Sequence, residues 1–193
     1  ESCNSFLNFY PTVAVVLYIV ADHLDFFHDL SEIEASFREF ASHVPEGGTI
    51  IANLDDENTM DALRPLGREL LTFGLSDKAD IWAKNIVQLG TQTDFDVIYQ
   101  GRKFTHVQLQ VPGIHNVKNA LAAFAASICV GCRPLADKYG LPAFRGAGWR
   151  YESKGKFNGA DIYDDYIHPT GELNALLNAA MTLRYTRKTT IFQ

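Results

Sequence analysis

One apolar run constrains the fold more than any other stretch of the sequence. Residues 12–27 read TVAVVLYIVADHLDFF, a run rich in β-branched residues that ends in a polar cluster. Its continuous hydrophobicity predicts a parallel strand covered on both faces, because a half-exposed strand would alternate apolar and polar residues. Ligands of open α/β sheets bind at the carboxyl ends of the strands. Asp22, His23 and Asp25 are therefore candidate site residues, although a capping aspartate and an ordinary loop histidine would fit the same pattern.

The segments that follow predict an α/β fold. Residues 30–44 repeat apolar side chains at spacings of three and four, as an amphipathic helix does, and Ser31 with Glu34 is expected to form its capping box. Further strands are expected over 49–53 and 69–74, with a short helix between them. This alternation calls for parallel pairing with right-handed crossovers, so we expect a mostly parallel sheet flanked by helices.

Two later segments differ in their apolar period. From residue 80 to 111 the period is two, which predicts a small antiparallel satellite sheet with one wet face, on which His106 is interpreted as a surface histidine. Residues 112–123, PGIHNVKNALAA, predict a helix that begins with His115, Asn116 and Asn119. Such groups can hydrogen-bond a purine edge or a ribose, while Asn116 as a plain N-cap would fit the spacing equally well.

Polar groups elsewhere are weaker candidates. Asp55 and Asp56 are interpreted as a solvated helix N-terminus, which the helix dipole favours, rather than as ligands.

The formal net charge is -6 and the 17 Lys and Arg residues are dispersed, which argues against a nucleic-acid surface. The three cysteines lack the second Cys or His pair of a zinc site, so we interpret them as reduced thiols. With no signal peptide and no membrane-spanning run, a cytoplasmic protein is expected.

A domain boundary is expected near Trp149, inside the glycine-rich stretch FRGAGWRYE. Residues 1–149 would form a central domain. Residues 150–193 would begin a Rossmann-like domain with two strands, a polar turn, a helix whose buried stripe includes Leu177, and a further strand from Lys188. About forty residues are too few for an independent domain of that kind, so we expect the sequence to lie within a longer chain.

Five stretches carry a family resemblance when they are taken in order: SFLNFYPTVAVVL, ADHLDFF, PGIHNVKNALAA, FRGAG and DIYDDY. Together they resemble the Mur ligase family over essentially the whole sequence. The resemblance implies an ATP-dependent ligase of peptidoglycan synthesis that phosphorylates the carboxylate of UDP-N-acetylmuramate. The amine of L-alanine then attacks the acyl phosphate, and a tetrahedral intermediate collapses to the amide. Mg²⁺ is implied as the ion that neutralises the phosphate charge.

The same resemblance implies roles for individual residues. It assigns Glu1 and His23 to the magnesium site, and His115, Asn116 and Asn119 to the adenine side of the nucleotide. Arg150 matches an arginine that reaches the nucleotide phosphates. The turn that meets the ribose and the acceptor amino acid matches Asp165 as a nucleotide-binding residue, with Tyr166 and His168 as catalytic candidates.

The sequence also departs from the family pattern. Tyr18 and Val20 stand where Asn and Glu are usual, Trp149 replaces the first of two arginines, and Pro169 with Thr170 follow His168 where His-Pro is usual. The phosphate-binding pattern GxxGKT does not occur in the 193 residues. Two hypotheses follow. The chain is part of an amino-acid ligase and is inactive as an isolated fragment, or it is a non-catalytic nucleotide-binding or interaction module that keeps the fold.

Overall fold

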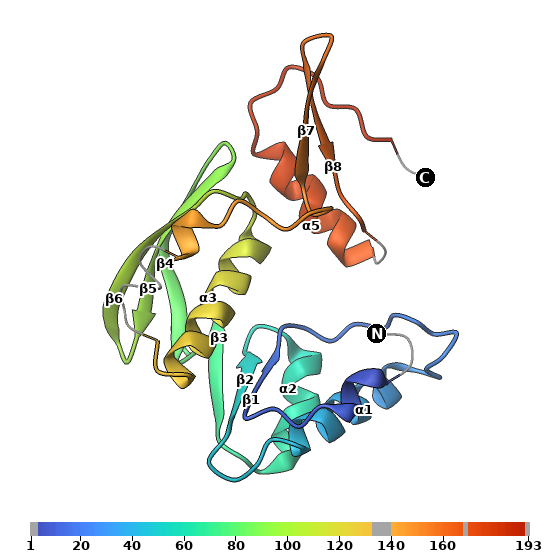
Figure 1. Cartoon of the computed structure of the whole chain (residues 1–193), viewed down its shortest axis with the longest axis vertical. Helices are drawn as coiled ribbons and strands as arrows, with labels where there is room; N and C mark the ends of the chain where they lie inside the picture. Colours follow the sequence, from blue (N-terminus) through green and yellow to red (C-terminus); the bar gives the residue numbers. More distant parts are fainter. Residues whose placement is uncertain (1–3, 133–139, 168–169, 192–193) are drawn as a thin grey trace.

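The computed structural model describes residues 4–132, 140–167 and 170–191 (Figure 1). Within these ranges, six strands form one mixed sheet in the order β1-β2-β3-β4-β5-β6, and β7 and β8 form a separate sheet. The strands are β1 (Val13–Val16), β2 (Thr49–Asn53), β3 (Leu70–Gly74), β4 (Ile81–Leu89), β5 (Gln92–Tyr99), β6 (Arg102–Leu109), β7 (Glu152–Phe157) and β8 (Ala160–Asp164). The helices are α1 (Leu30–Ser42), α2 (Glu57–Leu63), α3 (Ile114–Cys129) and α5 (Thr170–Met181), with 3-10 turns η1 (Ser5–Asn8) and η2 (Arg64–Leu66).

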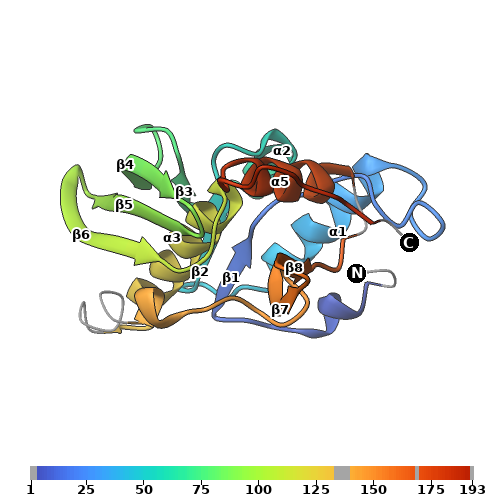
Figure 2. The same cartoon turned by 90° about the horizontal axis from the view of Figure 1, so that it is seen from above.

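Strands β1 to β4 pair in parallel, and β1 is covered on both faces as the sequence predicts. Ala14 and Val16 pack into a core with α1 and α2, whereas Val13 and Val15 pack against the core beneath α3. Figure 2 shows α1 and α3 on opposite sides of β1 and β2. The continuous apolar pattern of β1 therefore has the expected cause, since one set of alternate side chains is buried and the other is partly buried against a second core.

The strand predicted from the opening apolar run is too long. β1 ends at Val16, and the next apolar residues lie in a loop in which Leu17, Tyr18 and Val20 are 38%, 47% and 38% exposed. The chain leaves the sheet here because side chains at the end of β2 and just after it satisfy the backbone polar groups of Leu17 and Ile19 in place of a neighbouring strand.

The antiparallel meander is not a satellite sheet. β4 pairs in parallel with β3 at Phe73–Ile81, so β4, β5 and β6 continue the main sheet, and the separate small antiparallel sheet is β7-β8. Asp80 fixes this junction, because its Oδ2 accepts hydrogen bonds from Thr72 N at 2.8 Å and Thr72 Oγ1 at 2.6 Å. The α/β class with a mostly parallel sheet is confirmed.

Helix α1 begins earlier than its expected capping box. Asp29 is the N-cap and accepts a hydrogen bond from Glu32 N at 3.0 Å, while the Glu32 side chain accepts one from His28 N at 2.7 Å. The Ser31–Glu34 prediction is therefore wrong by two positions. The same type of pairing occurs, in the register set by the extended backbone of Asp29.

The carboxyl-terminal segment contains the β7-β8 hairpin and α5. The additional strand expected from Lys188 is absent from the described residues 187–191. Among the α5 side chains that the structure describes, Ala179 is buried while Leu177 is 38% exposed, so the predicted apolar stripe is only partly correct. Among the described residues no helix is long and apolar enough to cross a membrane, and Cys129 and Cys132 are free thiols.

The wet face of the meander carries a charged cluster around Asp96. Its carboxylate contacts Lys103 Nζ at 2.7 Å, His106 Nδ1 at 2.8 Å and Asn85 Nδ2 at 3.0 Å. The hydrogen bond from Lys103, followed by that from His106, lowers the pKa of Asp96 from 3.8 to about 2. His106 is 53% exposed at its side chain, so the prediction of a surface histidine is confirmed, although the ring is paired.

This cluster predicts an acid-sensitive contribution to stability. Because the folded pKa of Asp96 lies below its unfolded value, the contribution is present above pH 3.8 and is lost as the pH falls towards 2. We expect Asp96→Asn to lower the free energy of unfolding at pH 7 by about 1–2 kcal/mol and to flatten its decline over that pH range. Urea unfolding at several pH values measures both effects, with exposed Asp77→Asn as the control. An unchanged pH dependence in Asp96→Asn would contradict the assignment.

Candidate functional site at the carboxyl edge of the sheet

The loop after β1 is held by three side chains, one from the last residue of β2 and two from the segment that follows it. Asn53 Nδ2 donates to Leu17 O at 2.8 Å, and Asn58 Nδ2 donates to Ile19 O at 2.8 Å. Asp56 Oδ2 accepts from Ile19 N at 3.1 Å and also caps α2. Asp56 therefore lies at a helix N-terminus as predicted, and it is the N-cap of α2. These anchors fix the start of the loop that carries His23, and the sequence analysis did not identify Asn53 or Asn58.

His23 occupies a turn with a left-handed backbone. Its φ is 51°, a conformation that Asn, Asp, His and Gly adopt more readily than other residues. The amide of His23 donates to Asp22 Oδ1 at 2.8 Å, and the ring Nε2 lies 3.8 Å from Asp22 Oδ2. The imidazole is 40% exposed, so it is accessible to a ligand at this edge. Asp25 is also exposed.

The expected Mg²⁺ site is only partly represented. Glu1 lies outside the described residues, so its approach to His23 stays a prediction. Among the described residues, no group of three or more His, Cys, Asp or Glu side chains could hold a metal ion. Mg²⁺ commonly takes one or two protein ligands and completes its shell with water and phosphate oxygens. His23 beside the Asp22 carboxylate fits such a partial site, but not a site made of protein ligands alone.

The first turns of α3 present the residues expected at the adenine. Gly113, with φ 98°, is the N-cap, and the ring of His115 lies so close above it that a Cβ at position 113 would meet His115 Cε1 at 2.5 Å. Asn116 Nδ2 donates to Pro112 O at 2.7 Å, so Asn116 closes the turn without being the N-cap. Asn119 is exposed one turn further on. The structure therefore brings these three residues together on one helix end.

A second group of predicted residues meets at the junction before β7 and after β8. Arg150 donates from NH1 to Tyr166 O at 2.7 Å, and Tyr166 N donates to Trp149 O at 2.8 Å. Asp165 Oδ2 accepts from Tyr151 N at 3.0 Å. The two segments thus form one hydrogen-bonded unit. His168 lies outside the described residues, and the orientation of Arg150 towards the nucleotide stays a prediction.

The backbone on either side of Arg150 is strained. Trp149 and Tyr151 both have positive φ, 63° and 48°, which is uncommon for bulky residues. Trp149 is 64% exposed and contacts the Tyr166 ring edge-on at 6.1 Å between centroids. Trp149 therefore makes a ring contact at the junction while most of its side chain stays exposed.

Two close approaches connect the carboxyl-terminal segment with the region around the α3 N-terminus. A Cβ at Gly113 would lie 3.3 Å from Ala179 Cβ of α5. A Cβ at Gly146 would lie 3.5 Å from a methyl group of Val111. The glycines therefore allow the segments to pack closely at the helix end that carries His115 and Asn116.

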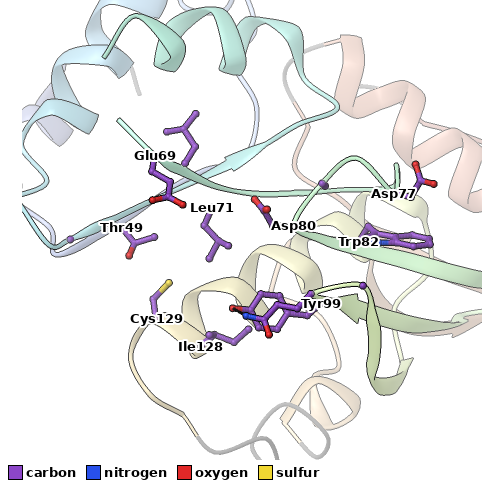
Figure 3. A pocket seen from close by; sticks show the side chains of 14 residues that line it. Thr49, Glu69, Leu71, Asp77, Asp80, Trp82, Tyr99, Ile128 and Cys129 are labelled. Atoms are coloured by element: carbon purple, nitrogen blue, oxygen red, sulfur yellow. Dashed lines mark hydrogen bonds between the residues drawn. The ribbon is translucent and has the colours of Figure 1, made fainter. Parts of the chain in front are cut away.

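A cavity of about 640 Å³ lies at the opposite edge, beside the first residues of β2 and β3 and the end of α3 (Figure 3). Its lining includes Thr49, Glu69, Asp80 and Cys129, which Figure 3 shows around the opening. Carboxylates around this space disfavour the phosphates of a nucleotide. The carboxyl edge, with its imidazole, amide and lysine side chains, remains the better candidate site.

Comparison with known proteins agrees with this geometry. Residues 3–127 match the family model described as the Mur ligase middle domain. The chain belongs to the Mur ligase family. Curated relatives named UDP-N-acetylmuramate--L-alanine ligase, from Caldicellulosiruptor saccharolyticus and Acetivibrio thermocellus, are 41% and 40% identical over the whole of this chain. The chain spans 43% and 42% of their respective lengths.

Solved structures of Mur ligases share the fold. MurF from Acinetobacter baumannii has a TM-score of 0.81 at 23% identity, and MurC from Thermotoga maritima has 0.76 at 24%. Each covers 93% of this chain, which in turn covers 39% and 40% of the respective structures. MurF from Thermotoga maritima, solved in complex with ADP, has a TM-score of 0.74 at 21% identity, with coverage of 89% and 39%. At these identities the likeness concerns the fold.

Proposed function

We propose that this chain is the ATP-binding part of a UDP-N-acetylmuramate:L-alanine ligase, which forms an amide through an acyl phosphate. The observation that supports this proposal most directly is the grouping of His115, Asn116 and Asn119 at the α3 N-terminus, within a chain of the Mur ligase family. The named relatives supply the substrate class, UDP-N-acetylmuramate and L-alanine. A cytoplasmic location belongs to the same proposal.

Each group of site residues has a proposed role that follows from its position in the fold. The imidazole and amides of α3 would hold the adenine and ribose, because they offer both hydrogen-bond donors and acceptors. Arg150 would contribute a fixed positive charge near the phosphates, and Asp165 and Tyr166 would orient the ribose and the acceptor side of the reaction. His23 would be one of the protein ligands that hold Mg²⁺, which would neutralise charge on the phosphate oxygens. Catalysis of this kind depends mainly on positioning and electrostatics.

The proposed domain organisation follows the same junction. Residues 1–149 would belong to the central domain and residues 150–193 to the beginning of the carboxyl-terminal domain. The separate β7-β8 sheet and the positive-φ residues around Arg150 support a boundary here. Such a junction allows one domain to close over the nucleotide that the other holds.

Asn119 offers a direct test, because its exposed side chain can be removed with little effect on the core. In the full-length protein we expect Asn119→Ala to weaken ATP binding about tenfold, the cost of losing one or two hydrogen bonds to the ligand. Calorimetric titration with ATP measures this, and L-alanine-dependent phosphate release tests the reaction itself. Exposed Asn174→Ala on α5 is the control. ATP binding without any release that depends on L-alanine and UDP-N-acetylmuramate would favour the non-catalytic module.

A further inference from the structure

The carboxylate of Asp55 joins three elements at the carboxyl edge of the sheet. Asp55 follows β2, and its Oδ2 accepts from Leu75 N at 2.9 Å, just after β3. The same oxygen contacts Lys118 Nζ of α3 at 3.0 Å. Asp55 N also donates to Asn53 Oδ1 at 3.1 Å, which fixes the backbone from which the carboxylate projects. Asp55 precedes the N-cap of α2 as expected, but its carboxylate is paired with Lys118 and is not merely solvated.

The surroundings of this contact leave the carboxylate little freedom. A Cβ at Gly74 would lie 2.7 Å from Asp55 Oδ1, so the carboxylate rests directly on the glycine backbone. The side chains of Asp55 and Lys118 are 19% and 26% exposed, whereas those of the surface pair Asp61–Arg64 are both 64% exposed. A partly buried pair with a second hydrogen bond is screened less by solvent than a fully exposed pair.

Lys118 lies within the turns of α3 that carry the proposed nucleotide contacts. It falls three residues after His115 and directly before Asn119, so its anchor fixes the rotation of this helix end relative to β2 and β3. We propose that Asp55 and Lys118 form a positioning pair that holds the α3 N-terminus in the geometry required for the nucleotide. This inference rests on the proposed function and adds two residues that act through His115, Asn116 and Asn119.

The pair can be tested in the full-length protein with Asp55→Asn, Lys118→Met and the double variant. We expect each single variant to weaken ATP binding about tenfold by calorimetry, and the double variant to be no weaker than the singles, because one interaction is lost in all three. Amide hydrogen exchange over residues 114–120 should become faster in each variant. Lys118→Arg should retain most of the affinity, since it keeps the charge.

Arg64→Met, which breaks the exposed Asp61–Arg64 pair, is the matched control and should leave affinity and exchange unchanged. Variants that bind ATP within twofold of the unmodified protein would overturn the positioning role, even if their unfolding temperatures fell. Losses that multiply in the double variant would also overturn it. Failure of the unmodified protein to bind ATP would overturn the proposed function itself, and the positioning role with it.

Discussion

Phe124→Ala is expected to lower the free energy of unfolding by about 3–5 kcal/mol, the usual cost of removing a fully buried aromatic side chain. Phe124 is 0% exposed in the middle of α3, and its ring packs edge-on against Phe104 at 5.0 Å and Tyr99 at 6.3 Å between centroids. It joins α3 to the meander, whose three strands are the longest strands of the sheet. A cavity left here would loosen the helix that carries the proposed nucleotide contacts.

Chemical denaturation of the folded chain, monitored by tryptophan fluorescence and circular dichroism, measures the loss. Phe157→Ala is a suitable control, because Phe157 is 68% exposed in β7 and its removal should change stability by less than about 0.5 kcal/mol. Phe124→Leu should cost less than Phe124→Ala, since it refills part of the volume. A loss below about 1 kcal/mol for Phe124→Ala would contradict the central place of this ring in the core.

The sequence predicted the layered core because the relevant signals are local. Both sets of alternate residues in β1 are apolar, and that pattern alone indicates a strand between two layers of helix. The length of strand β1 could not be predicted from this local pattern. The hydrogen bonds that carry Leu17 and Ile19 out of the sheet come from Asn53, Asp56 and Asn58, which are distant in the sequence.

The pairing of the meander with β3 also could not be predicted from the local sequence pattern. A period of two identifies antiparallel strands, but it does not say which other strand their edge will pair with. Here the connection between β3 and β4 is short. Asp80, just before β4, accepts hydrogen bonds from Thr72 in β3, and these contacts place β4 beside β3. The prediction of a satellite sheet failed at this one turn.

At the site, sequence motifs were sufficient to propose the residues that contact ligand but not those that support them. His115, Asn116 and Asn119 stand close together in the sequence, so their common location on one helix end could be expected. The contact between Asp55 and Lys118 joins two segments that only the fold brings together. A lysine on a polar helix turn and an aspartate after a strand each have many ordinary explanations, so neither indicated the pair.

The largest expected effect on the reaction is at His23. Because its backbone is left-handed, with φ 51°, alanine at this position would combine loss of the imidazole with backbone strain. Glycine adopts the same conformation without that strain, so His23→Gly isolates the imidazole. If the full-length protein has the proposed activity, we expect His23→Gly to lower kcat/KM on the order of 100-fold or more, because the Mg²⁺ site would lose one of its proposed protein ligands.

The metal dependence separates this role from a structural one. His23→Asn tolerates the backbone and restores an oxygen donor, so it should recover part of the activity and require more Mg²⁺ for half-maximal rate. His28→Ala is the matched control, because His28 lies nearby in the chain, is 93% exposed at its side chain and should leave both kcat/KM and the Mg²⁺ requirement unchanged. Equal losses in His23→Gly and His23→Asn, with an unaltered Mg²⁺ requirement, would show that the His23 side chain does not bind the metal.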